Sequence, residues 1–155
     1  MKPARLLLDT NILIDYLAQR QPFFGDAAKL RVAADFGDVE LWLCAQSIAD
    51  VEYILRKAIP LERLRAMLKG VTGFCSVAAV NGEDMVAGLD SEWPDLEDFC
   101  IARAAERIQA DRIITRDAEG FRRSPVPATD AATFFEALKA DCGIEYEDVS
   151  NLLRA

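Results

Sequence analysis

The sequence predicts an α/β fold, a three-layer α/β/α arrangement with a central parallel sheet of four to five strands. Short apolar runs of strand length recur along the chain, and segments with helical spacing of apolar residues separate them. No repeat, long linker or low-complexity stretch interrupts this alternation. Alternating strands and helices form βαβ units, in which helices cover both faces of a parallel sheet. We therefore assign residues 1–155 to one domain, with about 143–155 as an acidic C-terminal tail or helix.

The expected strands are short buried runs that end near polar residues. They cover residues 5–8, 40–45, 74–77 and 112–115, with a possible fifth at 126–128. The expected helices cover residues 11–20, 30–36, 47–58, 61–68, 82–87, 97–109 and 133–140. Pro60 ends the third of these helices or begins the fourth, because proline has no amide proton to donate within a helix.

Composition restricts the chemistry more sharply than it restricts the fold. The 155 residues contain no histidine, which excludes Ser-His-Asp and Cys-His catalysis and the histidine-based zinc enzymes. Acid–base or metal chemistry must then use carboxylates, hydroxyls, lysines or arginines. Oxygen-only metal ligands favour Mg²⁺ and Mn²⁺. The net charge of −8 suits a nucleic-acid enzyme only if acids cluster at one site or a basic partner binds.

The sequence also indicates a compartment. No apolar run approaches the roughly 18 residues that cross a bilayer, and the first residues lack a signal-peptide pattern. The four cysteines are scattered without a C-x-x-C pair, so we expect buried free thiols and no zinc site. The protein is therefore expected to be soluble and cytoplasmic.

Acidic residues follow two of the expected strands. Asp9 comes directly after the first strand, and Asp117 follows Thr115 and Arg116 at the end of the fourth. Sites in parallel sheets form beyond the carboxyl ends of the strands, so two neighbouring strands would deliver both aspartates to one crevice. Each aspartate alone also suits a helix cap or a turn.

Two helices begin with further acids. Ser47 and Asp50 resemble a capping box, and Asp95 precedes Asp98 in the same way. Glu52 is a rival to Asp50, but it lies about 200° around the helix and stands four residues before Arg56, as in a surface ion pair. Beside Asp98, Glu97 is expected to face water. Carboxylates that meet in one crevice repel one another unless cations are bound, although Arg103 or Arg116 could also compensate Asp98.

Four segments resemble the PIN-domain family, especially its VapC-type toxins. They are LLLDTNILIDYL at 6–17, SIADVEYILRK at 47–57, DLEDFCIARAA at 95–105 and ADRIITRDAEGF at 110–121. They occur in the family's order and span nearly the whole chain. The resemblance implies a PIN fold and a ribonuclease that uses Mg²⁺ or Mn²⁺ and leaves 5′-phosphate and 3′-hydroxyl ends.

The resemblance also assigns roles to residues. It implies that the metal-binding and catalytic acids are Asp9, Asp50, Asp98 and Asp117, that Thr115 is the family's hydroxyl, and that Asn11, Ser47, Asp95 and Arg116 are auxiliary. Two positions depart from the family pattern. The second acid is commonly glutamate, and an acid often found three residues after Asp117 is replaced here by Gly120.

Partners follow from the same resemblance. It implies an RNA substrate, a cognate antitoxin of a type II toxin–antitoxin pair and a homodimer, with Arg116 and Arg122 as candidate phosphate contacts. The apolar stripes Leu61–Leu64–Leu68 and Ile12–Tyr16 could serve dimerisation, although burial in the core is the default for both.

Two other functions stay open at this point. An aspartate-based phosphohydrolase would use Asp9 as its nucleophile, although such enzymes usually carry a second acid at the position of Asn11. A non-catalytic PIN scaffold or RNA-binding module would not need the four acids.

Overall fold

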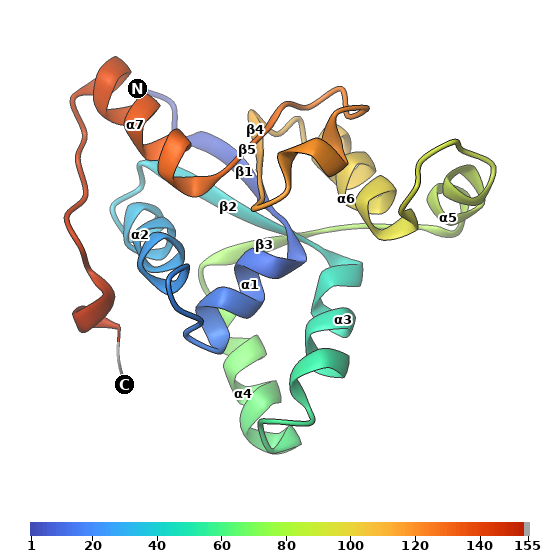
Figure 1. Ribbon diagram of the computed structural model, residues 1–155, viewed down its shortest axis with the longest axis horizontal. Helices are drawn as coiled ribbons and strands as arrows, with labels where there is room; N and C mark the ends of the chain where they lie inside the picture. The colour runs from blue at the N-terminus through green and yellow to red at the C-terminus, as the bar shows by residue number, and fades with distance from the viewer. Residues whose placement is uncertain (154–155) are drawn as a thin grey trace.

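A five-stranded parallel sheet forms the centre of the molecule, as the sequence predicts. The computed structural model describes residues 1–153, and its strand order is β3-β2-β1-β4-β5 (Figure 1). The strands are β1 Ala4–Leu8, β2 Val39–Cys44, β3 Cys75–Ala78, β4 Arg112–Ile114 and β5 Ala128–Thr129. The α/β prediction is confirmed.

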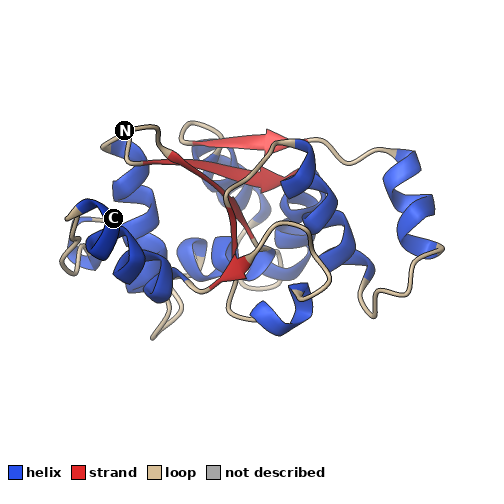
Figure 2. Cartoon of the chain, turned by 90° about the horizontal axis from the view of Figure 1, so that it is seen from above, coloured by secondary structure: helices blue, strands red, loops and turns tan. Residues whose placement is uncertain are grey.

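Helices flank the sheet and follow its strands in turn. They are α1 Thr10–Leu17, α2 Phe24–Asp35, α3 Ala45–Leu55, α4 Leu61–Val71, α5 Gly82–Leu89, α6 Leu96–Arg107 and α7 Ala131–Cys142, with 3₁₀ helices η1 Ala118–Phe121 and η2 Ser150–Leu152. Seen from above, the twisted sheet runs between these helices (Figure 2). Within residues 1–153, no helix is long and apolar enough to cross a membrane.

Alternate side chains of β1 pack into two separate apolar cores, because successive side chains of a strand point to opposite faces of the sheet. Leu6 and Leu8 pack with α1, α2, α3, α4 and α7, whereas Leu7 packs with α6. On the first side, Leu64, Leu68 and Ile12 are buried, so these members of the two apolar stripes belong to the core.

Two local predictions are wrong. Ser47 is the third residue of α3 and caps nothing, because the helix begins directly after β2 with Cys44 as its N-cap. Cys142 is an exposed free thiol, whereas the other three cysteines are buried as expected. α2 contains the expected helical segment from Leu30 and begins at Phe24.

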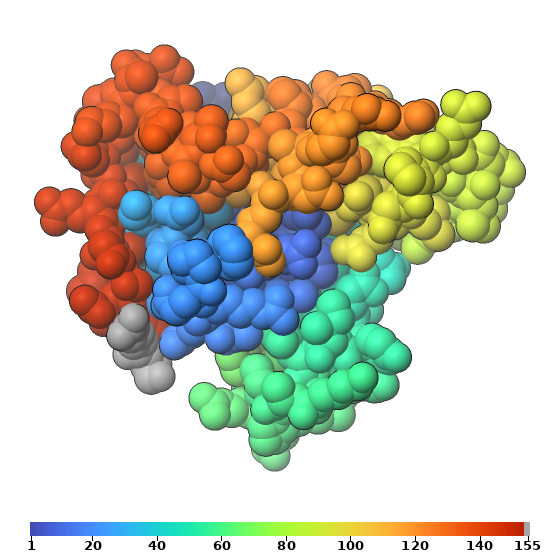
Figure 3. Space-filling model, viewed as in Figure 1, coloured from blue at the N-terminus to red at the C-terminus, as the bar shows by residue number. Residues whose placement is uncertain are grey.

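Residues 143–153 lie along the outer side of α2. Gly143, whose φ of 69° suits glycine, is the C-cap of α7, and after it the chain runs down the side of the molecule to η2 (Figures 1 and 3). Tyr146 holds this segment by a hydrogen bond to Asp38 and by ring contacts with Phe36 and Phe135. Residues 143–153 are therefore packed against the domain.

Gly88 of α5 packs tightly against side chains of α6. A Cβ at this position would lie 2.5 Å from Leu96 Cδ1 and 2.8 Å from Phe99 Cδ1. We expect Gly88→Ala to lower the free energy of unfolding by roughly 1–3 kcal/mol, because these side chains must shift. Gly82→Ala in the same helix has nothing within 4 Å and should be neutral or slightly stabilising. Urea unfolding of both variants checks this; equal effects would contradict the tight packing.

Candidate functional site

Adjacent strands bring the first two predicted acids together. β1 pairs with β4, so the segments that follow them leave the sheet side by side. Thr115 Oγ1 donates a hydrogen bond to Asp9 Oδ2 at 2.7 Å, and it accepts one from the Asp117 amide at 3.0 Å. The threonine hydroxyl thereby connects the backbone at Asp117 with the carboxylate of Asp9, which is only 4% exposed.

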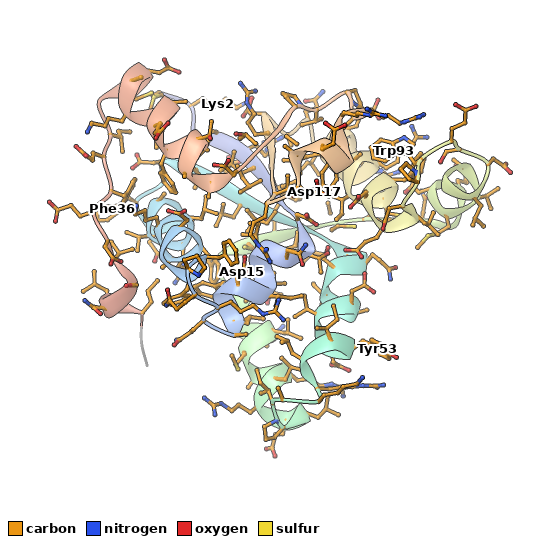
Figure 4. The ribbon with its side chains drawn as sticks, viewed as in Figure 1. Lys2, Asp15, Phe36, Tyr53, Trp93 and Asp117 are labelled. Atoms are coloured by element: carbon orange, nitrogen blue, oxygen red, sulfur yellow. The ribbon has the colours of Figure 1, made fainter. Side chains whose placement is uncertain are left out.

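The N-terminus of α6 brings the third acid to the same place. Asp95 caps the helix by accepting a hydrogen bond from the Asp98 amide at 3.0 Å. A Cβ at Gly120 would lie 3.0 Å from both Asp98 Oδ2 and Asp117 Oδ2. These two carboxylates, 19 positions apart in the sequence, therefore converge over the glycine. Figure 4 labels Asp117 near the middle of the molecule.

The fourth acid comes from α3. Asp50 accepts a hydrogen bond from Gln46 Nε2 at 3.2 Å, one turn earlier on the same helix. In the first turn of α3, the buried Ser47 Oγ lies 2.8 Å from Thr10 Oγ1. This hydrogen bond joins α3 to α1, so Ser47 supports the helix that carries Asp50.

Glu97 also belongs to this site, and the prediction that it faces water is wrong. It is half-buried and hydrogen-bonds to Thr10, and its pKa is raised by burial and by the charges of Asp50, Asp9 and Asp95. The physical reason is the orientation of α6. Its N-terminal end points at the site, so successive residues of the first turn reach the acids.

Thr10 is a buried site residue that sequence reasoning missed. Its hydroxyl meets both Ser47 and Glu97. The available signal was its place directly after Asp9, where a buried strand enters a helix.

Mutual repulsion and burial perturb the clustered acids. Burial and, after it, the charges of Asp95, Asp9, Glu97 and Asp117 together raise the pKa of Asp98 to about 7. Burial also raises the pKa of Asp9; the Thr115 hydrogen bond and, more weakly, the Arg116 charge oppose this rise. These carboxyl groups therefore ionise less readily than carboxyl groups in water unless a cation compensates their charges.

Glu52 lies apart from this cluster, as predicted, although its partner differs. Arg65 of α4 donates two hydrogen bonds to it, at 2.8 and 3.0 Å, and these bonds lower its pKa. The expected partner, Arg56, instead lies over the Tyr53 ring. Glu52 is therefore committed to joining α3 and α4, which leaves Asp50 as the acid of α3 at the site.

Arg116 is engaged inside the protein. It donates hydrogen bonds to Asp15 Oδ2 at 2.8 Å and to Asp15 Oδ1 at 3.3 Å, and its guanidinium lies 4.0 Å from the Phe23 ring centroid. Asp15 is fully buried. This ion pair connects α1 with the segment between Thr115 and Asp117. Arg116 therefore stabilises the position of this segment at the site.

No basic side chain neutralises the cluster directly. Within residues 1–153, no ion pair reaches Asp9, Asp50, Asp98 or Asp117; Arg103 pairs with Asp84 and Arg122 with Glu119. The predicted auxiliary Asn11 is exposed in the first turn of α1.

The donor set can be tested against a metal ion by its chemistry. Carboxylate and hydroxyl oxygens from four separate segments are ligands that suit Mg²⁺ or Mn²⁺, and they lack another cation. In the side-chain conformations of this structure, no group of three acidic or cysteine residues among 1–153 is arranged to hold a metal ion. The residues fit a hard cation by type and charge, and the carboxylates would have to draw together around it.

The raised pKa of Asp98 gives a pH-dependent prediction. The folded protein keeps this proton up to about pH 7, whereas the ordinary pKa is 3.8. Stability is therefore lost as pH rises from about 4 through 7 in the absence of metal. Asp98→Asn removes this loss, so we expect its Tm at pH 8 in EDTA to exceed that of the wild type by on the order of 5 °C.

Thermal melts at pH 4 and pH 8 check this prediction. The two proteins should melt alike at pH 4, and an Asp90→Asn control, at an exposed position after α5, should show no such pH-dependent gain. A gain that is equal at both pH values would contradict the electrostatic origin.

Comparisons with known proteins point to one family. Residues 5–119 match the family model of the PIN domain. A search of curated protein sequences found no significant match. Among solved structures, VapBC2 from Rickettsia felis, bound to a DNA fragment from its promoter, aligns with a TM-score of 0.60 and 15% identity, covering 81% of this chain and 98% of that one.

Two further structures share the fold. A toxin–antitoxin complex from Klebsiella pneumoniae aligns with a TM-score of 0.58 and 23% identity, covering 81% of this chain and 97% of that one. FitAcB from Neisseria gonorrhoeae aligns with a TM-score of 0.55 and 14% identity, covering 82% and 98%. At these identities the likeness establishes the fold alone.

Proposed function

The chain belongs to the PIN-domain family, and we propose that it is a cytoplasmic, metal-dependent endoribonuclease. One observation carries the proposal. Asp9, Asp98 and Asp117 come from three separate segments and act on one another's charges, Asp50 of α3 acts on the neighbouring Glu97, and none of the four forms an ion pair with any residue in 1–153. A structural role would favour arginine partners such as the one that Asp15 has.

The acids are proposed to hold Mg²⁺ or Mn²⁺, with Asp9, Asp98 and Asp117 as principal ligands and Asp50 completing the set. When bound, such an ion supplies charge neutralisation at the scissile phosphate and lowers the pKa of an attacking water. Thr115 fixes the direction of Asp9 through its 2.7 Å hydrogen bond. Thr10 and Glu97 lie beside the acids, where Glu97 in its carboxylate form would accept a proton from an approaching hydroxyl or water.

Arg116 is not proposed as a phosphate ligand, because Asp15 binds one edge of its guanidinium and the Phe23 ring lies over one face. Arg122, which is exposed and among residues 1–153 pairs with the exposed Glu119, stays a candidate for such a contact. Exposed ion pairs of this kind exchange readily.

A toxin role is proposed on the same basis. Solved structures that share the fold include a toxin–antitoxin complex, so we infer a cognate antitoxin and a homodimeric toxin for this chain. The net charge of −8 favours a basic antitoxin segment over the acidic site. Co-expression with the product of the neighbouring reading frame and light scattering test the two assemblies; a lone monomer in both would contradict them.

Cleavage itself is the test of the proposed function. Purified protein is incubated with end-labelled transfer and ribosomal RNA in Mg²⁺, in Mn²⁺ or in EDTA. We expect defined fragments with 5′-phosphate ends in either metal and intact RNA in EDTA. Cleavage that persists in EDTA would overturn the metal-dependent mechanism, and intact RNA in all three conditions would overturn the nuclease.

A further inference from the structure

The α3–α4 arm carries more basic than acidic side chains, although the whole chain is acidic. It projects beyond the rest of the surface in the view of Figure 3. Residues 45–71 contain five basic and three acidic side chains, in a chain whose net charge is −8. One of the three acids, Glu52, is already paired with Arg65. The arm is therefore a basic segment of an acidic protein, and it begins at the acidic site.

The outer face of α3 carries an exposed aromatic ring beside unpaired cations. Tyr53 is 60% exposed, and the Arg56 guanidinium lies 4.5 Å from its ring centroid. Ile54 is 45% exposed next to it. Within residues 1–153, Arg56 and Lys57 form no ion pair. Figure 4 shows Tyr53 on the side of α3 that faces away from the body.

This surface is continuous with the acids. Residues three and four apart lie on one face of a helix, so Asp50, Tyr53 and Ile54 form one stripe on α3, and Lys57 follows two residues after the helix ends at Leu55. At 1.5 Å per residue, the Cα atom of Tyr53 is roughly 5 Å along the helix axis from that of Asp50. This separation places Tyr53 within one or two nucleotides of the site.

We infer that the outer face of α3, with Tyr53 as stacking platform and Arg56 and Lys57 as phosphate contacts, binds a base of single-stranded RNA next to the scissile phosphate. The inference rests on the proposed function and names its substrate subsite. Exposed aromatic rings combined with arginine and lysine are the usual means of holding single strands. A purely apolar protein interface would not need unpaired cations at its centre.

Binding can be measured apart from cleavage. A labelled single-stranded oligo(U) is titrated by fluorescence anisotropy against the Asp9→Asn protein, in which cleavage is blocked. We expect Tyr53→Ala in this background to weaken binding about 10-fold and Tyr53→Phe to keep it. Lys57→Gln should reduce the slope of log affinity against log salt by roughly 0.7. Phe36→Ala is the matched control, because Phe36 is a 75% exposed aromatic side chain after α2.

The outcomes separate the two proposals. In the wild-type background, Tyr53→Ala should raise KM for oligo(U) cleavage and leave kcat nearly unchanged. If wild-type protein binds oligo(U) through Tyr53 but cuts no RNA, the nuclease fails and the subsite stands. Equal binding by the Tyr53→Ala and Phe36→Ala proteins, or no binding at all, overturns the subsite. Loss of antitoxin binding in Tyr53→Ala with oligo(U) binding intact overturns it in favour of a protein-docking surface.

Discussion

Asp9→Asn should lower kcat/KM for RNA cleavage by roughly 10³-fold or more while leaving the fold intact, because it removes one negative charge from the proposed metal site. Asparagine has nearly the same shape as aspartate, and its side-chain oxygen still accepts the Thr115 hydrogen bond that Asp9 accepts at 2.7 Å. Circular dichroism and thermal melts establish that the variant is folded, and single-turnover cleavage measures the loss.

Glu52→Gln is the matched control for this experiment. Glu52 is an acid on α3, two residues from Asp50, but Arg65 holds it away from the cluster. The control should keep nearly full activity. Cleavage at the wild-type rate by the Asp9→Asn protein, or an equal loss in Glu52→Gln, would contradict the assignment of the site.

Arg116→Ala should lower the free energy of unfolding by roughly 3–5 kcal/mol, because it leaves the carboxylate of Asp15 buried without its partner. The Asp15 side chain is only 1% exposed, and burial already raises its pKa. Arg20 also acts on Asp15, which favours the lower part of the range. Urea denaturation at pH 7 measures the change.

Two further variants identify the buried charge as the cause. Arg122→Ala breaks an arginine–carboxylate pair of 3.0 Å on the surface, where the expected effect is below about 1 kcal/mol. Adding Asp15→Asn to the Arg116→Ala protein removes the charge and should restore part of the stability. If Arg116→Ala and Arg122→Ala were equally mild, the buried pair would not anchor the segment between Thr115 and Asp117.

Much of the fold was predictable because its signals are local. Apolar runs of strand length and helical spacing depend on neighbouring residues, so every expected strand is found within about two residues of its expected place. The meeting of Asp9 and Asp117 was predictable too, since residues after neighbouring parallel strands share one edge of the sheet. The remaining acids followed from the family resemblance.

The local predictions that were wrong concern features that depend on tertiary contacts. Ser47 has the sequence pattern of a helix cap, but the direct passage from β2 into α3 places it inside the helix, where it meets Thr10. The sequence pattern predicts that Glu97 faces water, but the N-terminal end of α6 points into the site. Neither orientation is encoded in the residues next to these positions.

The Asp15–Arg116 pair was equally beyond a reading of neighbouring residues. Its members are 101 positions apart, and only the packing of α1 beneath the end of β4 brings them together. Sequence reasoning therefore placed Arg116 on a phosphate, whereas in the fold it is committed to a buried carboxylate. The sequence shows which residues are charged, but the partner of each charged side chain depends on the tertiary fold.

The central claim is that the clustered carboxylates bind a divalent cation, and calorimetric titration with Mn²⁺ tests it most directly. The wild-type protein should bind Mn²⁺, and near pH 6.5 binding should release protons, since the pKa of Asp98 is raised to about 7 in the metal-free protein. The Asp9→Asn and Asp98→Asn proteins should bind at least 10-fold more weakly, and Glu52→Gln should bind as the wild type does. No binding by the wild type, or the same affinity in all four proteins, would contradict the account.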